Sequence, residues 1–316
     1  MADKKVIVTG GAGFIGSSLV DKLLMLDYSV RVIDNLSTGK EENIGYHLDK
    51  GSFEFIKADL LKDDISSYFK GIDEVWHLAA NPDVKSGITD TKSMVDQNIL
   101  VTYNVLEAMR KNGVKKINFT SSSVVYGEAK TIPTPEDYSP LVPISVYGAS
   151  KLASEALISA YSHTFDMYGV IFRLANVVGP RSDHGVIHDF IMKLKENGNL
   201  LKILGDGSQK KSYIYIDDCI EGMILASNTS GRINFFNIGS DDQIDVKEIA
   251  KIISDAMGLQ PVFEYGREDR GWKGDIPVML LSTDKLKSIG WRLTYDSSNA
   301  VKLAAKYLLE SGKAGD

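Results

Sequence analysis

Short apolar runs recur along the first half of the chain, with helix-like stretches between them. The runs are rich in Val, Ile and Phe and do not alternate with polar residues, which is typical of parallel strands covered on both faces. Apolar residues at helical spacing occupy Ile15–Met25, Met94–Lys111 and Ala149–Tyr161. This order predicts an α/β fold with a Rossmann-type, doubly wound parallel sheet. The runs are Val6–Val8, Val30–Ile33, Phe53–Ile56, Glu74–Leu78, Ile117–Phe119 and Val170–Leu174.

The alternation ends after Leu174, where glycine and proline become frequent, as in Gly179-Pro180 and Gly205-Asp206-Gly207. Further short elements and a final helix near Ala300–Leu309 follow. We therefore expect a first domain over residues 1–176, which parts of 213–240 rejoin, and a smaller C-terminal substrate-binding domain over 177–316.

Composition excludes several classes of protein. With 316 residues, 43% hydrophobic and 25% charged, the chain is of ordinary globular type. A net charge of -6 argues against nucleic acid as a partner. The single cysteine, Cys219, can form neither an internal disulfide nor a multi-thiolate metal site, and we expect no metal. No run approaches the roughly 20 apolar residues of a membrane span, and the start lacks a signal-peptide pattern, so we expect a cytoplasmic protein without membrane contact.

A glycine-rich turn joins the first strand to the first helix. Thr9 is followed by Gly10-Gly11-Ala12-Gly13-Phe14-Ile15-Gly16, and glycine lets the backbone turn tightly and approach a pyrophosphate. The helix start offers unpaired N–H groups to the same anion. The alternative is a turn that only connects strand to helix. The residues expected to contact the dinucleotide here are Gly10, Gly13, Phe14, Ile15 and Gly16.

Acidic residues end the next two strands. Asp34 lies roughly 20 residues beyond the turn, where a carboxylate can accept hydrogen bonds from ribose hydroxyls, and this favours NAD over NADP. Arg31 lies upstream, within the strand. Asp59 can meet the adenine amino group; a solvated strand end is the alternative for Asp34. The neighbours assigned to the cofactor with them are Asn35, Ser37, Thr38, Gly39 and Leu60.

Tyr147 and Lys151 are spaced one helical turn apart and so project from the same helix face. A tyrosine with a pKa near ~10 is a poor base, but a neighbouring ammonium and an oxidised nicotinamide both favour its phenolate. Tyr147 could then remove a proton from a substrate hydroxyl. Taken alone, the spacing also fits a half-exposed tyrosine above a solvated lysine. Upstream, Thr120-Ser121-Ser122-Ser123 ends a strand and could supply a hydroxyl for the substrate oxygen, or could simply cap that strand.

Taken together, these motifs resemble the extended short-chain dehydrogenase/reductase family, within it the NAD-dependent nucleotide-sugar epimerases and dehydratases, and most closely the UDP-glucose 4-epimerase branch. The likeness covers nearly the whole chain. The matching stretches are Thr9–Gly16, Asp34–Gly39, Ala58–Leu60, His77–Ala80, Asn98, Thr120–Gly127, Tyr147–Lys151, Arg173–Arg181, Gly205–Asp218 and Gly274-Asp275.

The resemblance implies a role for each matching residue. Tyr147 is the base, Lys151 also binds the nicotinamide ribose, and Ser122 is the family's hydroxyl residue, with Ser123 as a weaker substitute. It further implies a homodimer formed through helices Met94–Lys111 and Ala149–Tyr161, although their apolar faces also fit an internal core. The cofactor would be lined by Leu78, Ala79, Ala80, Lys85, Asn98 and Ala175, and the UDP-linked sugar by Asn176, Lys202, Leu204 and Lys211.

The residues after Ser122 favour one reaction. Related dehydratases and decarboxylases carry a carboxylate here, whereas this chain has Val124-Val125-Tyr126-Gly127. The cysteine of fucose-synthase-type reductases also has no match. We therefore expect an NAD-dependent epimerase that inverts C4 of UDP-glucose, UDP-galactose or their N-acetyl forms. The alternatives are a net dehydratase, dehydrogenase or reductase on a related nucleotide sugar, and a non-catalytic NAD-binding regulatory protein.

Two departures from the family and one residue of the sugar pocket leave the identity of the sugar open. Lys211 replaces the family's arginine, giving a point charge in place of a two-pronged donor. Trp272-Lys273 stands where an arginine usually precedes the glycine, so Arg267 or Arg270 would have to reach the second phosphate, unless both are solvated loop charges. Met279 borders the sugar pocket by resemblance, and its flexible side chain neither excludes nor favours an N-acetyl group.

Overall fold

The computed structural model describes residues 4–311, so the outermost residues of the expected domain ranges, 1–3 and 312–316, lie outside the described residues. The chain divides into two compact units. The first comprises residues up to Val125 together with Ser145–Arg173 and Met223–Phe236. The second comprises Tyr126–Ile144, Leu174–Gly222 and the chain from Asn237 onward.

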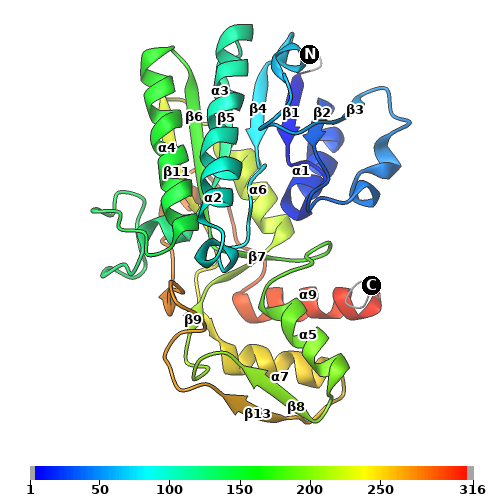
Figure 1. Ribbon diagram of the computed structural model, residues 1–316, viewed down its shortest axis with the longest axis vertical. Helices are drawn as coiled ribbons and strands as arrows, with labels where there is room; N and C mark the ends of the chain where they lie inside the picture. The colour runs from blue at the N-terminus through cyan, green and yellow to red at the C-terminus, as the bar shows by residue number, and fades with distance from the viewer. Residues whose placement is uncertain (1–3, 312–316) are drawn as a thin grey trace. The chain divides into compact units, whose positions relative to one another are not determined.

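A seven-stranded sheet in the order β11-β6-β5-β4-β1-β2-β3 forms the centre of the fold (Figure 1). Strands β1 to β5 pair in parallel, as the continuous apolar runs predict. The order steps outward from β1 in both directions, which is the doubly wound arrangement, and the expected fold class is confirmed. The strands are β1 (Lys5–Thr9), β2 (Ser29–Asp34), β3 (Phe53–Lys57), β4 (Glu74–His77), β5 (Lys116–Ser122), β6 (Tyr168–Leu174) and β11 (Ile233–Ile238).

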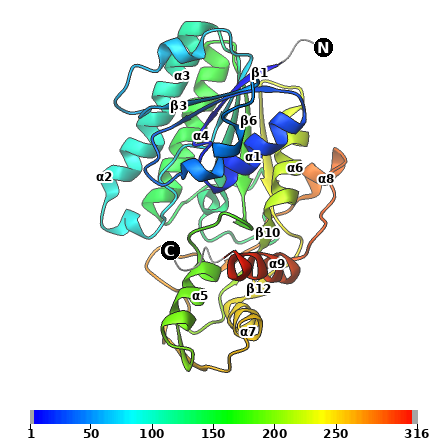
Figure 2. The ribbon, with the colours of Figure 1, turned by 90° about the vertical axis from the view of Figure 1, so that its right-hand side faces the viewer.

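Helices cover both faces of this sheet. Figure 2 shows α3 (Val101–Asn112) and α4 (Val146–Thr164) on one side and α1 (Phe14–Met25) on the other. Side chains of α3 and α4 pack on strand residues such as Ile7 and Phe119 in one buried core. Shorter elements are η1 (Glu41–Asn43), η2 (Gly45–His47), η3 (Ser66–Phe69), η4 (Ser86–Ile88), α2 (Thr91–Met94), the π-helical η5 (Val95–Leu100) and η6 (Ser123–Tyr126).

The second unit has its own core. Helices α5 (Val186–Glu196), α7 (Val246–Ala256) and α9 (Ser297–Glu310) pack together, with Phe190 and Ile253 among the buried residues. Small sheets pair β10 with β7, β8 with β13, and β9 with both β12 and β14. The remaining bounds are β7 (Asn176–Val178), β8 (Leu200–Ile203), β9 (Lys210–Lys211), β10 (Tyr213–Tyr215), α6 (Ile216–Ser227), β12 (Ile244–Asp245), β13 (Val262–Tyr265), β14 (Val278–Met279) and α8 (Asp284–Ser288).

The segment Tyr126–Ile144 groups with the second unit, although it falls inside the range 1–176. Its contacts explain why. The Tyr126 hydroxyl donates to Asn237 Oδ1 at 2.7 Å, and Asn237 Nδ2 donates to the Thr134 carbonyl oxygen at 2.9 Å. Thr134 also forms a β-bridge with Leu281. Contacts between residues so far apart produce no periodic pattern in the sequence from which they could be predicted.

Candidate functional site

The glycine turn after β1 is packed too tightly for side chains at Gly10, Gly11 and Gly16; at Gly11 a Cβ would lie 2.7 Å from Val32 Cγ1. Gly10 has a φ of +69°, and a Cβ there would lie 2.7 Å from the Ala79 backbone nitrogen. A Cβ at Gly16 would lie 2.1 Å from the carbonyl oxygen of Gly10. Gly13 differs, since its Cβ would meet only the Gly10 carbonyl oxygen, at 3.4 Å. Packing therefore requires glycine at these three positions, while Gly13 keeps the outer side of the turn bare.

Helix α1 begins directly after this turn, with Gly13 as its N-cap and no capping side-chain hydrogen bond. The first N–H groups of a helix have no intrahelical acceptor, and with the helix dipole they attract anions. The backbone of Phe14 and Ile15 thus fits a pyrophosphate.

Asp34, at the end of β2, is fixed beside the turn. Its Oδ2 accepts from the Ala12 N–H at 2.9 Å and its Oδ1 from the Leu36 N–H at 2.8 Å. Burial raises the pKa of Asp34, and these two hydrogen bonds oppose that rise. The carboxylate is therefore held as an acceptor next to the turn. The Asp34 carboxylate, as an acceptor, and the bare glycine turn fit a dinucleotide with free ribose hydroxyls.

Ser122, Tyr147 and Lys151 lie at the contact between β5 and α4. The Tyr147 side chain is hydrogen-bonded to Ser122. Lys151 Nζ donates to the Thr120 carbonyl oxygen at 2.9 Å and lies 4.9 Å from the centre of the Phe119 ring. Helix α4 begins at Val146 because the Ser145 side chain caps it by accepting from the Gly148 N–H at 3.0 Å. The structure thus brings together the three residues that the sequence assigned to proton transfer.

In the protein without NAD, burial is the main cause of the pKa shifts of Tyr147 and Lys151. It raises the pKa of Tyr147 to about 12, against the Ser122 hydrogen bond that lowers it. It lowers the pKa of Lys151 to about 8, against the charge of Glu155 that raises it. The tyrosine is neutral at pH 7 in this state, so its function as a base requires an additional positive charge nearby.

His77, at the end of β4, is fully buried in a hydrogen-bonded chain. Its Nδ1 lies 2.7 Å from Thr9 Oγ1 and its Nε2 lies 3.0 Å from Thr102 Oγ1. Thr102 donates its own proton to the Asn98 carbonyl oxygen at 2.6 Å, so its oxygen must accept from His77 Nε2–H. The geometry therefore assigns the neutral Nε2–H tautomer. Burial first, and the charge of Lys151 second, lower the pKa of His77 to about 3.

We expect His77 to make the fold sensitive to acid. The unfolded chain binds a proton at His77 below about pH 6.5, whereas the native state stays neutral down to about pH 3. The unfolded state then holds more protons, so the free energy of unfolding should fall by about 1.4 kcal/mol per pH unit below pH 6.5. Urea unfolding between pH 7.5 and 5 measures this slope. His77→Gln should unfold more easily at pH 7.5 but lose that part of the slope; an unchanged slope would contradict the assignment.

Asn98, in the π-helical turn η5, is saturated by protein contacts. Its Oδ1 accepts from the Asn81 N–H at 2.8 Å and its Nδ2 donates to Ser150 Oγ at 2.8 Å. Ser150 in turn donates to the Tyr147 carbonyl oxygen at 2.7 Å. Asn98 therefore ties the loop after β4 to the first turn of α4, the turn that carries Tyr147.

The other residues that the sequence assigned to the cofactor differ in position and in exposure. Leu78 and Ala79 bond through their N–H groups to Thr9, and Lys85 is exposed. Asp59 is already engaged, with Lys62 at 3.3 Å and hydrogen bonds from Leu61 and Asn35. Ala175 belongs to the second unit. Ser123 is buried at the start of η6; Ala80, Asn35, Ser37, Thr38 and Gly39 lie in the loops that follow β4 and β2, and Leu60 is buried after β3.

In the second unit, Lys211 forms the centre of a small cluster. Its Nζ lies 2.5 Å from Asp275 Oδ1 and 5.3 Å from the centre of the Trp272 ring. Met279 pairs with Lys211 in the parallel register of β14 and β9. The pairing of Lys211 with Asp275 was not predicted from the sequence, because Asp275 lies far along the chain. Asn176 Nδ2 donates to the Ser212 carbonyl oxygen at 3.1 Å, next to Lys211.

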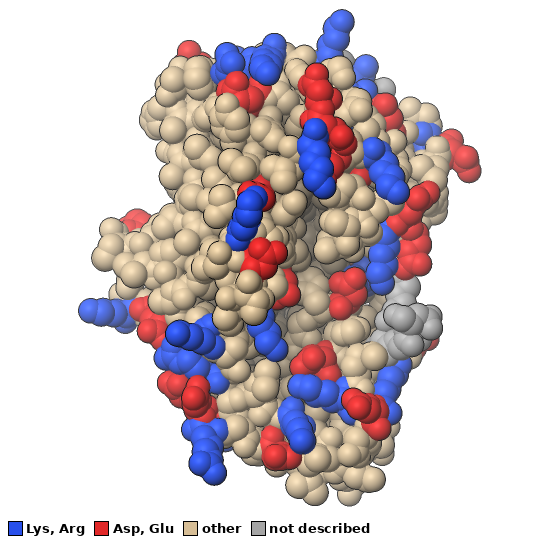
Figure 3. Space-filling view, viewed as in Figure 1, with Lys and Arg blue, Asp and Glu red and all other residues tan. Residues whose placement is uncertain are grey.

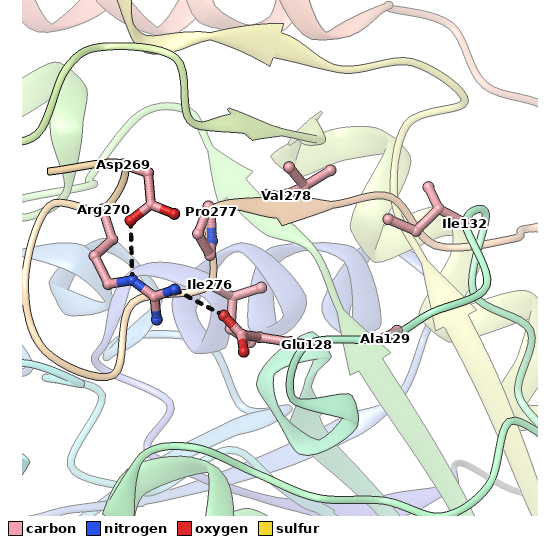
Figure 4. A pocket seen from close by; sticks show the side chains of 8 residues that line it. All are labelled: Glu128, Ala129, Ile132, Asp269, Arg270, Ile276, Pro277 and Val278. Atoms are coloured by element: carbon pink, nitrogen blue, oxygen red, sulfur yellow. Dashed lines mark hydrogen bonds and ion pairs between the residues drawn. The ribbon is translucent and has the colours of Figure 1, made fainter.

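The two candidate replacements for the missing arginine differ. Arg267 is exposed, whereas Arg270 lies 3.0 Å from Glu128 Oε1 and 3.3 Å from Asp269 Oδ1. Figure 4 shows the Arg270 guanidinium between these two carboxylates at the wall of a pocket of about 280 Å³, which Ile276, Pro277 and Val278 also line. Lys202 and Leu204 are exposed at and after β8. Arg270 is thus paired with acidic side chains, and Arg267 has the greater access to solvent.

In residues 4–311, no helix is long and apolar enough to span a membrane, and no group of His, Cys, Asp or Glu could hold a metal ion. Basic and acidic side chains are interspersed over the face drawn in Figure 3.

The fold and this set of residues define a class: a Rossmann-type protein with a glycine turn and a paired Tyr147 and Lys151. The model of the NAD dependent epimerase/dehydratase family matches residues 6–239, and the chain belongs to this family. The UDP-glucose 4-epimerase of Mycolicibacterium smegmatis is 34% identical, with 91% of this chain and 93% of that protein covered.

Solved structures of similar proteins support the assignment of the chain to this family. A crystal structure of a UDP-galactose 4-epimerase is 42% identical, with a TM-score of 0.87 over 97% of this chain and 99% of that one. A UDP-glucuronic acid 4-epimerase from Bacillus cereus, in complex with UDP-glucuronic acid and NAD, is 33% identical, with a TM-score of 0.89 over 97% and 99% of the two chains. The expected family and its NAD cofactor are confirmed.

Proposed function

We propose that this enzyme inverts the C4 hydroxyl of a UDP-linked hexose by transient oxidation, with Tyr147 as the proton acceptor and donor. The observation that carries the proposal is the grouping of half-buried Ser122 with buried Tyr147 and Lys151 in a chain of this family. NAD held by the first unit would supply the hydride acceptor for the oxidation at C4 and the hydride donor for the reduction.

The protein residues perform the proton transfer. The Ser122 hydroxyl, hydrogen-bonded to Tyr147, holds the sugar 4-hydroxyl next to the phenol oxygen. The ammonium of Lys151, fixed by the Thr120 carbonyl, adds a positive charge that favours the phenolate. Tyr147 accepts the proton on oxidation and returns it on reduction, so no proton, electron or mass is gained overall.

Binding of NAD is assigned to the first unit. The bare outer side of Gly13 and the N-terminus of α1 would hold the pyrophosphate, and Asp34 would accept from the ribose hydroxyls. A phosphate on the 2′-oxygen would be repelled by the Asp34 carboxylate, so NAD is preferred to NADP.

The residues around Ser122 favour epimerisation over dehydration or decarboxylation, because those two reactions are expected to need a free carboxylate there. Helix η6 after Ser122 has the sequence Ser-Val-Val-Tyr and contains no acid. Glu155 is nearby on α4, but Arg173 and Ser121 hold it at 2.8 Å and 2.5 Å. A carboxylate with these partners is not available to a substrate.

In the second unit, we assign Lys211 and Arg267 to the diphosphate and Asn176 and Met279 to the sugar. Lys211 must exchange or share its partner Asp275 when an anion binds. A lysine makes this exchange as a point charge, without the fixed two-pronged geometry of arginine. Lys202, Leu204 and Arg270 are assigned supporting contacts with the nucleotide sugar.

The proposed function is tested by offering the purified enzyme UDP-glucose, UDP-galactose, their N-acetyl forms and UDP-glucuronic acid without added cofactor. We expect at least one of them to be converted to its C4 epimer of equal mass. Accumulation of reduced NAD, or loss of water or carbon dioxide, would instead establish the alternative net reactions.

We further propose a homodimer formed through α3 and α4, in the cytoplasm. Val95, Leu100 and Tyr103 expose 42%, 42% and 45% of their surface along η5 and α3. The neighbouring outer face of α4 carries Leu152 and Ala156. Apolar side chains gathered on two adjacent helices are typical of a subunit interface.

The proposed location in the cytoplasm is supported by the single buried cysteine, which is typical of proteins in a reducing compartment.

The proposed dimer predicts the effect of a charge on this face. Leu100→Glu should convert a particle of twice the chain mass into one of a single chain mass in light scattering, because a buried unpaired carboxylate opposes association. Val262→Glu, at an apolar residue of β13 that is 69% exposed and belongs to the second unit, is the control and should leave the mass unchanged. A wild-type particle of single mass would contradict the dimer.

A further inference from the structure

Helix α4 is attached to the end of β5 by contacts from three successive turns. Tyr147 is hydrogen-bonded to Ser122, Lys151 donates to the Thr120 carbonyl, and Glu155 accepts from the Ser121 hydroxyl at 2.5 Å. The helix residues are spaced by four and the strand residues are consecutive. Two of these contacts involve the residues assigned to proton transfer, and the third fixes the same strand end from the next turn.

Glu155 is a buried charge with two partners. It is 3% exposed, and Arg173 on β6, also 3% exposed, donates from Nε at 3.1 Å and from Nη2 at 2.8 Å. The Arg173 guanidinium also lies 4.8 Å from the centre of the Phe235 ring. A buried ion pair with this bidentate geometry fixes the orientation of both side chains. The strand end, the helix and β6 are thereby joined at one point behind Lys151.

We propose that Glu155 is a positioning residue for Lys151 and Ser122: with Arg173 and Ser121 it fixes α4 against the end of β5 and balances the charge next to the Lys151 ammonium. This inference rests on the proposed function. Because Arg173 and Glu155 cancel, Lys151 remains the net positive charge of the group. That charge is then available to Tyr147.

The charged and titratable groups around Lys151 give the sign of each expected change. Tyr147 and Glu155 face it from α4, His77 from β4, and Arg173 lies beyond Glu155 on β6. His77 is neutral at pH 7, so the balance depends on Glu155 and Arg173. Loss of the Glu155 charge removes a negative charge next to Lys151 while the positive charge of Arg173 stays, which disfavours the ammonium. Loss of the Arg173 charge has the opposite effect.

The experiment is an NMR titration of the enzyme with bound NAD and carbon-13-labelled lysines, with the Lys151 signal identified by its loss in Lys151→Arg. Glu155→Gln should lower the titration midpoint of Lys151 by about one pH unit or more. Arg173→Met should raise it. The double variant Glu155→Gln/Arg173→Met removes both charges but retains an acceptor for Ser121, and its midpoint should return to the wild-type value.

If Glu155→Gln fails to fold, Arg173→Met and the double variant still give the test. An unchanged midpoint in the single variants, or equal shifts in the single and double variants, would overturn the proposal. The alkaline limb of kcat/KM should move with the midpoint. A wild-type enzyme inactive on every nucleotide sugar would refute the proposed function, but the titration would still decide the role of Glu155.

Discussion

Tyr147→Phe should lower kcat by about 10²- to 10⁴-fold, the usual contribution of a positioned acid–base group. The change removes only the hydroxyl that exchanges a proton with the sugar, and the ring stays buried against the same neighbours. NAD content and the thermal midpoint should therefore stay close to those of the wild type. Steady-state kinetics on the sugar that is converted, with NAD released by denaturation and quantified, measures both.

Tyr168→Phe is the matched control. Tyr168 begins β6 and is 51% exposed, so removing its hydroxyl should leave kcat unchanged. A Tyr147→Phe enzyme with more than about a tenth of wild-type kcat would show that another group transfers the proton, since less than about 1.4 kcal/mol of barrier would then come from the hydroxyl.

Alanine substitutions in the glycine turn should separate folding from cofactor binding. Gly16→Ala places a Cβ 2.1 Å from a backbone oxygen, so we expect it to lower the free energy of unfolding by about 2–3 kcal/mol and to lose NAD. Gly13→Ala meets only an ordinary contact at 3.4 Å and has extended backbone, so the fold should persist. Its methyl group occupies the side assigned to the pyrophosphate, and NAD affinity should fall by about tenfold or more.

Urea unfolding of protein freed of NAD, together with calorimetric titration of NAD, distinguishes these two effects. Gly45→Ala is the control, because a Cβ at Gly45 meets nothing within 4 Å and the residue lies outside the turn. Full NAD affinity in Gly13→Ala would show that the pyrophosphate does not approach the backbone there.

Much of this fold could be predicted because its strands are buried on both faces. Every predicted apolar run corresponds to a strand of the central sheet, from β1 to β6. The helix expected over Met94–Lys111 is instead divided into α2, the π-helical η5 and α3. Asn98 lies in η5 and bonds to Ser150 and Asn81, contacts that sequence periodicity cannot indicate.

The proton-transfer residues could be predicted because Tyr147 and Lys151 are near neighbours on one helix. Their supporting residues could not, since Arg173 contacts Glu155 from a different element. One signal was present: Arg173 interrupts the apolar run of β6, and a charge in a buried strand requires a partner. Lys211 and Asp275 are likewise distant in sequence. The pairing of β9 with β14 and the hydrogen bond from the Asp206 N–H to the Glu268 carbonyl oxygen bring that region together.

In the proposed reaction, a hydride leaves C4 of the sugar and returns to C4 on the opposite face. This proposal is tested most directly by supplying UDP-glucose with deuterium at C4 to the enzyme in ordinary water, or the corresponding labelled form of whichever sugar is converted. We expect an epimer that retains its deuterium at C4, with no net reduction of NAD. Deuterium lost to the solvent, or an epimer inverted at another carbon, would contradict it.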